Sequence, residues 1–169
     1  MTKSYHLLNI FTLVCFISVL IESQSYGATT TATMAVSVNV VGDCTVSASP
    51  FVFSDYDPSG GQPALDQVNA ITVQCANEEA YKTALSTGYG TYTQRLMKNA
   101  GNPDLNYQLY TDLARAHVWG DGSGSTTLPE GAGTGFPQIL TVYGTIPASQ
   151  TTIPSGLTYT DSITVTVSY

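Results

Sequence analysis

Residues 34–41 read Met-Ala-Val-Ser-Val-Asn-Val-Val, with an apolar side chain at every second position. This period of two is typical of a β-strand that buries one face. Residues 163–169, Ile-Thr-Val-Thr-Val-Ser-Tyr, repeat the pattern at the end of the chain. Both segments are predicted to be strands, and the first has no evident partner. The residues on the two apolar faces are Met34, Val36, Val38, Val40, Ile163, Val165, Val167 and Tyr169.

The beginning of the chain has the layout of a secretory signal peptide. Lys3 precedes an apolar run over residues 7–21, and the small residues Ser25 and Gly27 follow it. The run is too short and wrongly flanked for a membrane span. We expect cleavage after Gly27, which predicts a signal peptide (1–27), an N-terminal extension (28–41) and one domain (42–169). No second apolar stretch follows, so we expect no membrane span in the exported chain.

The charge of the chain limits the classes of partner. Its formal net charge is −7, and the few Lys and Arg residues after the signal are scattered. Nucleic-acid binding needs clustered basic residues that neutralise phosphates, so we expect no nucleic-acid partner. Plentiful Thr, Ser, Gly and Tyr favour β-structure in an extracellular setting.

Cys44 and Cys75 are the only cysteines after the predicted signal. An oxidising compartment favours their pairing as a disulfide. Closing this loop would stabilise the fold by roughly 3–4 kcal/mol. A redox or metal role has less support, because there is no Cys-x-x-Cys motif and only His117 could assist.

The rest of the chain also has the pattern of β-structure. No long stretch shows a helical period, and Gly or Pro interrupts the sequence at short intervals. Short strands with turns between them predict an all-β sandwich or barrel. Loops are expected at 58–61, 120–124 and 129–135, and one helical turn is possible at 112–116. The predicted strands are 34–41, 45–53, 70–76, 81–86, 94–98, 105–111, 139–146 and 157–169.

Residues 55–66 partly match a calcium-loop template. Pro58 at the fourth position, Asp in place of Glu at the twelfth and the lack of flanking helices weaken the match. We therefore interpret the segment as a solvated turn and expect no metal and no cofactor. The matching residues are Asp55, Asp57, Ser59, Gly60 and Asp66.

Aromatic residues around Trp119 could form a platform for stacking on sugars. The interpretation we favour places Trp119 in the core, before the Gly120 turn. His117 stands beside no Ser or Cys nucleophile motif, so the sequence predicts no catalytic triad and no enzyme. The other members of the platform would be Tyr107, Tyr110 and Tyr143.

Six segments, taken in order, resemble the successive signatures of the spore coat protein U domain family. The resemblance runs from about Cys44 to Tyr169 and includes the cysteine pair and the terminal Tyr. The segments are 53–58 (FSDYDP), 71–75 (ITVQC), 105–112 (LNYQLYTD), 119–122 (WGDG), 142–150 (VYGTIPASQ) and 159–163 (YTDSI).

That family includes subunits of archaic chaperone-usher pili, and the resemblance implies their fold, an immunoglobulin-like sandwich that lacks its last strand. In such pili the N-terminal extension of the next subunit supplies the missing strand. The resemblance implies that residues 31–41 are the donor and that residues 158–169 border the acceptor groove. The donor side chains would be Met34, Val36, Val38 and Val40. The implied partners are other copies or sibling pilins, a periplasmic chaperone and an outer-membrane usher.

The energetics of such an exchange are plausible on physical grounds. Burying four apolar side chains contributes on the order of 6–12 kcal/mol before costs, which is comparable with the stability of a whole domain. The implied function is a non-enzymatic subunit of a surface fibre, exported through the periplasm, with a role in adhesion or biofilm formation. The alternatives are a secreted coat or matrix protein, a monomeric glycan-binding adhesin and a calcium-loop module. Residues 34–41 could also be the first strand of a self-contained sandwich.

Overall fold

The computed structural model describes residues 27–169, so the predicted signal peptide lies outside the described residues except for Gly27. The chain divides into two units between Val38 and Asn39, and each is described by itself. Residues 27–43 form no strand and their side chains are exposed. The predicted strand over 34–41 is therefore not formed in this single chain. Among the described residues, no helix is long and apolar enough to cross a membrane.

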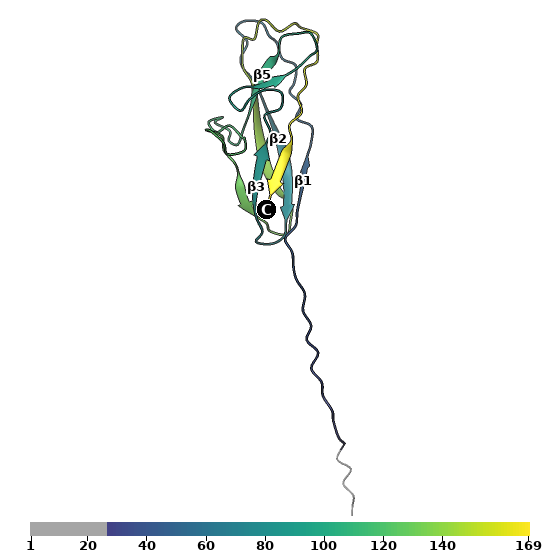
Figure 1. Cartoon of the computed structure of the whole chain (residues 1–169). Coiled ribbons are helices and arrows are strands. Elements are labelled where there is room, and N and C mark those ends of the chain that lie inside the picture. The colour runs from purple at the N-terminus through teal and green to yellow at the C-terminus, as the bar shows by residue number, and fades with distance from the viewer. Residues whose placement is uncertain (1–26) are drawn as a thin grey trace, which may run out of the picture. The chain divides into compact units, whose positions relative to one another are not determined.

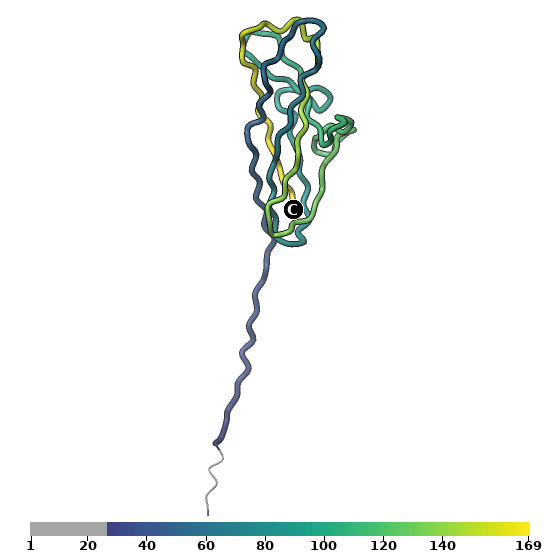
Figure 2. Tube along the Cα trace, turned by 180° about the vertical axis from the view of Figure 1, so that it is seen from behind, coloured from purple at the N-terminus to yellow at the C-terminus, as the bar shows by residue number. Residues whose placement is uncertain are grey.

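Residues 39–169 form two antiparallel β-sheets (Figures 1 and 2). The larger sheet has the order β1-β2-β7-β5-β4, and the smaller has the order β6-β3-β8. The strands of the larger sheet are β1 (Cys44–Ala48), β2 (Leu65–Cys75), β7 (Gln138–Ile146), β5 (Leu105–Tyr110) and β4 (Arg95–Met97). Those of the smaller sheet are β6 (Glu130–Ala132), β3 (Ala80–Leu85) and β8 (Val165–Ser168).

The core lies between the inner faces of the two sheets. Alternation along β2 places Ile71, Val73 and Cys75 inside, where each is at most 4% exposed. Trp119 fills the centre, and its indole Nε1 donates to the carbonyl of Thr83 over 2.8 Å. The all-β sandwich predicted from the sequence is confirmed, and the described residues contain no helix.

Several predicted elements need correction. The segment 129–135, predicted to be a loop, contains β6, which pairs with β3. The predicted strand 45–53 ends at Ala48 in the structure. The predicted strand 157–169 forms a ladder only over β8, with one isolated bridge between Thr160 and Lys98. The turn at 112–116 is closed by the Arg115 N–H and the Asp112 carbonyl at 3.1 Å and is not a helix.

The sandwich has two ends, which we name the base and the far pole. The base holds the start of β1, the end of β2 and the end of β8, with Cys44 paired to Cys75 across the ladder. β1 runs from the base toward the far pole, and β8 runs back toward the base (Figure 1). Within residues 27–169, each of these strands has a ladder partner on one side only, β2 for β1 and β3 for β8. One edge of each sheet is therefore free on the same side of the sandwich.

Candidate functional site

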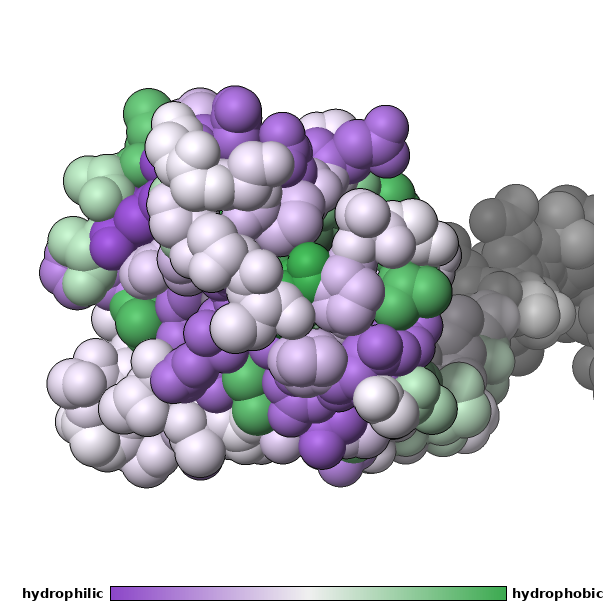
Figure 3. Space-filling view, turned by 90° about the horizontal axis from the view of Figure 1, so that it is seen from above, coloured by the Kyte–Doolittle hydropathy of each residue, from purple (hydrophilic) through white to green (hydrophobic). Residues whose placement is uncertain are grey.

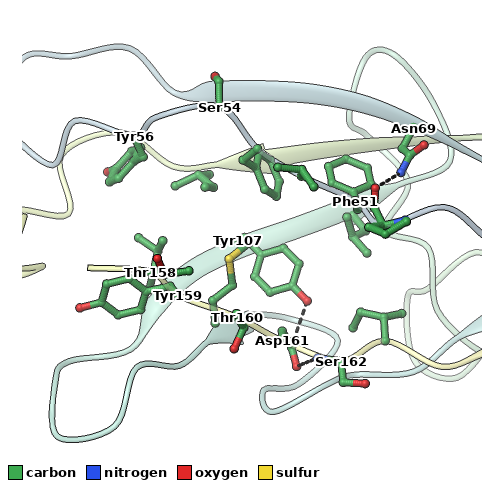
Figure 4. Close-up of a pocket in the computed structure, with 18 of the residues that line it drawn as sticks. Phe51, Ser54, Tyr56, Asn69, Tyr107, Thr158, Tyr159, Thr160, Asp161 and Ser162 are labelled. Carbon is green, nitrogen blue, oxygen red and sulfur yellow. Dashed lines mark hydrogen bonds between the residues drawn. The ribbon is translucent and has the colours of Figure 1, made fainter. Parts of the chain in front are cut away.

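A cleft of about 810 Å³ lies between these two free edges. One wall is the extended segment 48–56, which continues from β1, and the other is the segment 157–165, which leads into β8. Figure 4 shows Phe51 and Tyr56 on the first wall, Tyr159 to Ser162 on the second, and Tyr107 of β5 between them. Figure 3 looks down on the far pole and shows apolar surface near its middle, ringed by neutral and polar residues.

The apolar side chains on both walls pack on the core but remain partly exposed to solvent. They pack against the buried cluster, yet each remains only half-buried. An apolar side chain that is half-exposed gains free energy when another apolar group covers it, at about 25 cal/mol for each Å² removed from water. These half-buried residues are Phe51, Phe53, Tyr56, Tyr159, Ile163 and Val165.

The two walls reach their positions through polar contacts outside a regular ladder. The amide of Asn69 donates to the carbonyls of Ser49 (3.1 Å) and Pro50 (2.8 Å), which fixes the first wall beside β2. In the second wall, Thr160 exchanges two backbone hydrogen bonds with Lys98, at 2.8 and 3.1 Å. Along the chain, the second wall therefore pairs first with Lys98, the residue after β4, and then continues as β8, which pairs with β3.

Tyr107 and Asp161 form a polar contact on the floor of the cleft (Figure 4). The Tyr107 hydroxyl donates to Asp161 Oδ2 over 2.6 Å, and Asp161 Oδ1 accepts from the backbone N–H of Tyr89 (3.1 Å) and of Ser162 (2.6 Å). Burial, together with Asp161, raises the pKa of the Tyr107 hydroxyl well above its ordinary value. This contact ties the second wall to the floor.

The four predicted border residues have different positions. Ile163 and Val165 line the cleft, and Val167 packs half-buried against the core. Tyr169 is 61% exposed and does not line the cleft; its hydroxyl lies 3.5 Å from Asp43 Oδ1 at the base. The predicted donor side chains Met34, Val36, Val38 and Val40 are 83–85% exposed.

The predicted disulfide is present. Cys44 and Cys75 are bonded and lie 31 positions apart in the sequence. Cys44 begins β1 and Cys75 ends β2, so the bond closes the base beside the free edge. Cys44 lies near the start of the unit formed by residues 39–169.

The calcium-loop residues do not converge. Asp57 accepts from the N–H (2.8 Å) and the hydroxyl of Ser59, and these bonds lower the pKa of its carboxyl. Asp66 lies in β2, where it binds Arg115 (3.0 Å) and the Thr145 hydroxyl (2.7 Å). No group of three acidic, Cys or His residues suited to a metal occurs in the described part of the chain.

The aromatic platform is not formed either. Trp119 is 1% exposed and Tyr107 is 4% exposed, so neither ring face is open to a sugar. The core position favoured for Trp119 is confirmed. His117 is exposed and its Nδ1 lies 3.1 Å from Asp112 Oδ2, the carboxylate that also accepts from the His117 N–H.

Sequence reasoning missed most of the cleft. The family resemblance implied a groove border at residues 158–169, which includes most of the second wall, but neither the resemblance nor the sequence pattern indicated the first wall or the floor. Phe51 and Phe53 do alternate with exposed residues, and this was a usable signal. The contact of Tyr107 with Asp161 joins positions that are 54 residues apart, so no local pattern predicts it.

Comparisons with known proteins agree with this geometry. The family model of the Spore Coat Protein U domain matches residues 30–166. Protein U of Myxococcus xanthus is 35% identical over 166 residues, which cover 87% of this chain and 89% of that protein.

A solved structure shares the fold. It is a chain in the crystal structure of the CsuC–CsuE chaperone–tip adhesion subunit pre-assembly complex from the archaic chaperone-usher Csu pili of Acinetobacter baumannii. The TM-score is 0.55 at 21% identity, and the match covers 77% of this chain but only 40% of that one. The likeness therefore concerns the fold of a part of that chain.

Proposed function

Because the chain belongs to the spore coat protein U domain family, we propose that it is a structural subunit of an extracellular fibre of the chaperone-usher type. The matched family and fold are those of structural subunits, not of enzymes. In this proposal the subunits polymerise by strand donation, in which residues 31–41 of one copy fill the cleft of another.

The observation that carries the proposal is the apolar cleft between the free edges of β1 and β8. Unpaired strand edges are templates for an added strand, which gains main-chain hydrogen bonds from the edge and specificity from alternate side chains. Residues 34–40 have the required alternation, and the walls of the cleft supply half-buried aromatic and aliphatic side chains. Segment and cleft match in chemistry.

Strand donation between copies produces an open fibre. The donor segment and the cleft are different surfaces of one chain, so the contact is heterologous and each subunit can both give and receive a strand. Four apolar side chains at about 1.5–3 kcal/mol each would contribute on the order of 6–12 kcal/mol before the costs of association. We therefore expect an unfilled subunit to be marginal and a filled one to be durable.

The same proposal includes a route and partners. The segment before residue 28 would direct export, and a periplasmic chaperone would cover the cleft until an outer-membrane usher assembles the subunits, which are copies of this chain or sibling pilins. The fibre would then serve adhesion or biofilm formation at the cell surface. The description of the family as a spore coat domain supports a second candidate, a coat or matrix protein assembled without an usher.

A pair of charge variants tests strand donation. Val36→Asp with Val38→Asp places two carboxylates on the donor face, where burial without a partner is costly. Ser37→Asp with Asn39→Asp adds the same charge to the opposite face of the segment. We expect the first variant to stay as chaperone-bound or monomeric subunits and the second to form fibres as the parent does, as observed by electron microscopy and size-exclusion chromatography.

Deleting residues 28–38 should have the same effect as the first variant. Normal fibres from the deletion, or from the Val36 and Val38 variant, would contradict strand donation and favour the coat or matrix alternative.

A further inference from the structure

The connection between the proposed donor segment and its own domain is short. Three residues, 41–43, separate Val40 from Cys44, so the two Cα atoms lie at most about 14 Å apart. When residues 34–40 of one subunit occupy a neighbour's cleft, the base of the first subunit must lie close to one end of that cleft. A second contact between the two subunits is therefore unavoidable.

The structure indicates which end of the cleft this is. At the base, Asp43 before β1 and Tyr169 after β8 approach to 3.5 Å. Most lining residues lie toward the far pole, in the segments 48–58 and 153–163. The mouth of the cleft is therefore at the far pole, where the base of the next subunit would dock. With Val40 at the far pole, the donor strand runs from the base to the far pole, which is opposite to the direction of β8. Antiparallel pairing with β8 is slightly more stable per residue than parallel pairing.

The base of the subunit, which would dock at the mouth of the neighbour's cleft, presents a large apolar side chain. Phe136 is 74% exposed, in a loop that the end of β2 holds tightly. The Gly135 N–H donates to the Cys75 carbonyl (3.1 Å), and the Gln74 amide donates to the Gly135 carbonyl (2.9 Å). Cys75 is in turn bonded to Cys44. A short, cross-linked path thus connects Phe136 with the donor segment.

The mouth of the cleft presents complementary side chains. Val52 on the first wall is 69% exposed, and Leu157 on the second is 43% exposed. Both belong to the lining of the cleft, and the described part of the chain leaves a large share of each side chain exposed. An aromatic side chain between them would close the mouth over a seated strand and exclude water from its last hydrogen bonds. Exposed aromatic residues on a rigid loop are typical anchors of protein interfaces.

From this geometry we infer that Phe136 at the base of each subunit packs against Val52 and Leu157 at the mouth of its neighbour's cleft. The inference rests on the proposed strand donation and adds a contact between folded domains. It makes the fibre joint two-part, with a flexible strand that anchors and a rigid aromatic contact that sets the angle between successive subunits.

Cysteine pairs test the contact in the full exported chain. Phe136→Cys combined with Leu157→Cys, and separately with Val52→Cys, should give a ladder of disulfide-linked oligomers on non-reducing gels once fibres have formed. A disulfide needs Cα atoms within about 7 Å, so cross-linking reports direct proximity. The matched control is Leu113→Cys with Leu157→Cys, because Leu113 is 68% exposed on a side turn held to Asp66 by Arg115.

A substitution gives an independent measurement. Fibres of Phe136→Ser should dissociate in denaturant on the order of tenfold faster than parent fibres, whereas Leu113→Ser fibres should match the parent. Two results together would overturn the Phe136 contact while leaving strand donation intact. Fibres of both cysteine-pair variants would give no disulfide-linked oligomers on the gel, and fibres of Phe136→Ser would dissociate at the parent rate. Failure of the parent chain to form fibres would overturn the proposed function, and this inference with it.

Discussion

At the scale of single residues, Asp161 has the most consequential contacts in the cleft. Its carboxylate accepts from the Tyr107 hydroxyl and from the backbone N–H groups of Tyr89 and Ser162, and the first two of these donors hold the second wall to the rest of the domain. Gly88 permits this arrangement, because a Cβ at that position would overlap the Asp161 carboxylate. Gly88 also has a φ of 64°, a conformation that favours glycine. The wall is thus fixed by one acidic side chain and a glycine 73 positions away in the chain.

Tyr107→Phe removes one of these donors without changing the shape of the ring. A hydrogen bond to a charged group contributes about 1.5–3 kcal/mol, so we expect the free energy of unfolding to fall by about that amount at pH 7. The folded state raises the pKa of this tyrosine above its ordinary value near 10. Its contribution is therefore present below pH 10 and is lost as the pH rises and the unfolded chain ionises.

The measurement is denaturant unfolding of parent and variant between pH 7 and pH 11. The difference between them should shrink above pH 10, because the variant has no hydroxyl to ionise at position 107. Tyr89→Phe is the matched control, since Tyr89 is exposed and its hydroxyl makes no hydrogen bond among the described residues. A difference that stays constant with pH would argue against a buried, Asp161-bound hydroxyl.

At the scale of elements, strong alternation predicted the central strands well. β3, β5 and β7 were located to within one or two residues, because each buries one face between the sheets. The N-terminal half of β2, residues 65–69, was missed because polar Asp66, Gln67 and Asn69 interrupt the apolar pattern there. Pairing with β7 over nine residues forms this part of the strand, and no local pattern contains that information.

Two further differences have specific causes. β6 was predicted to be a loop because Gly131 and Pro129 are turn residues, but the ring of Tyr81 occupies the space that a Cβ at Gly131 would need. Glycine is therefore required there for packing. The strand predicted over 45–53 ends early because Pro50 has no N–H and the Asn69 amide takes the carbonyls that a ladder would use.

Gly144 of β7 shows how an element shapes the cleft. A Cβ at this position would lie 2.5 Å from Phe51 Cζ and 2.9 Å from Phe53 Cζ. Gly144→Ala should push the Phe51 and Phe53 rings away from β7, which narrows the cleft. The resulting strain should lower the free energy of unfolding by about 1–3 kcal/mol. Thermal unfolding and the rate of fibre assembly measure the two effects. Gly60→Ala, where a Cβ meets nothing within 4 Å, should change neither; equal effects of the two substitutions would contradict this account.

At the scale of the whole molecule, the proposed donor segment and the cleft proposed to receive it differ in how directly the sequence encodes them. The donor segment and the second wall are continuous stretches with a period of two, which can be read directly. The cleft, in contrast, is assembled from β5, β7 and segments 48–56 and 157–165. Its floor depends on contacts between distant positions, and family resemblance was therefore needed to predict that a groove exists at all.

A synthetic peptide of residues 30–41 would test the cleft without fibre formation. The acceptor is the full exported chain carrying Val36→Asp and Val38→Asp, which keeps its cleft but cannot donate a strand. Peptide at about 100 times its dissociation constant should stabilise this chain by about 2.7 kcal/mol, which raises the melting temperature by roughly 5–10 °C for a domain of this size. The peptide with Asp at positions 36 and 38 is the control and should leave the melting temperature unchanged. A site that recognises alternate apolar side chains must discriminate between the two peptides. If both peptides raised the melting temperature equally, or if neither raised it at saturation, the cleft would not be a site for the donor segment.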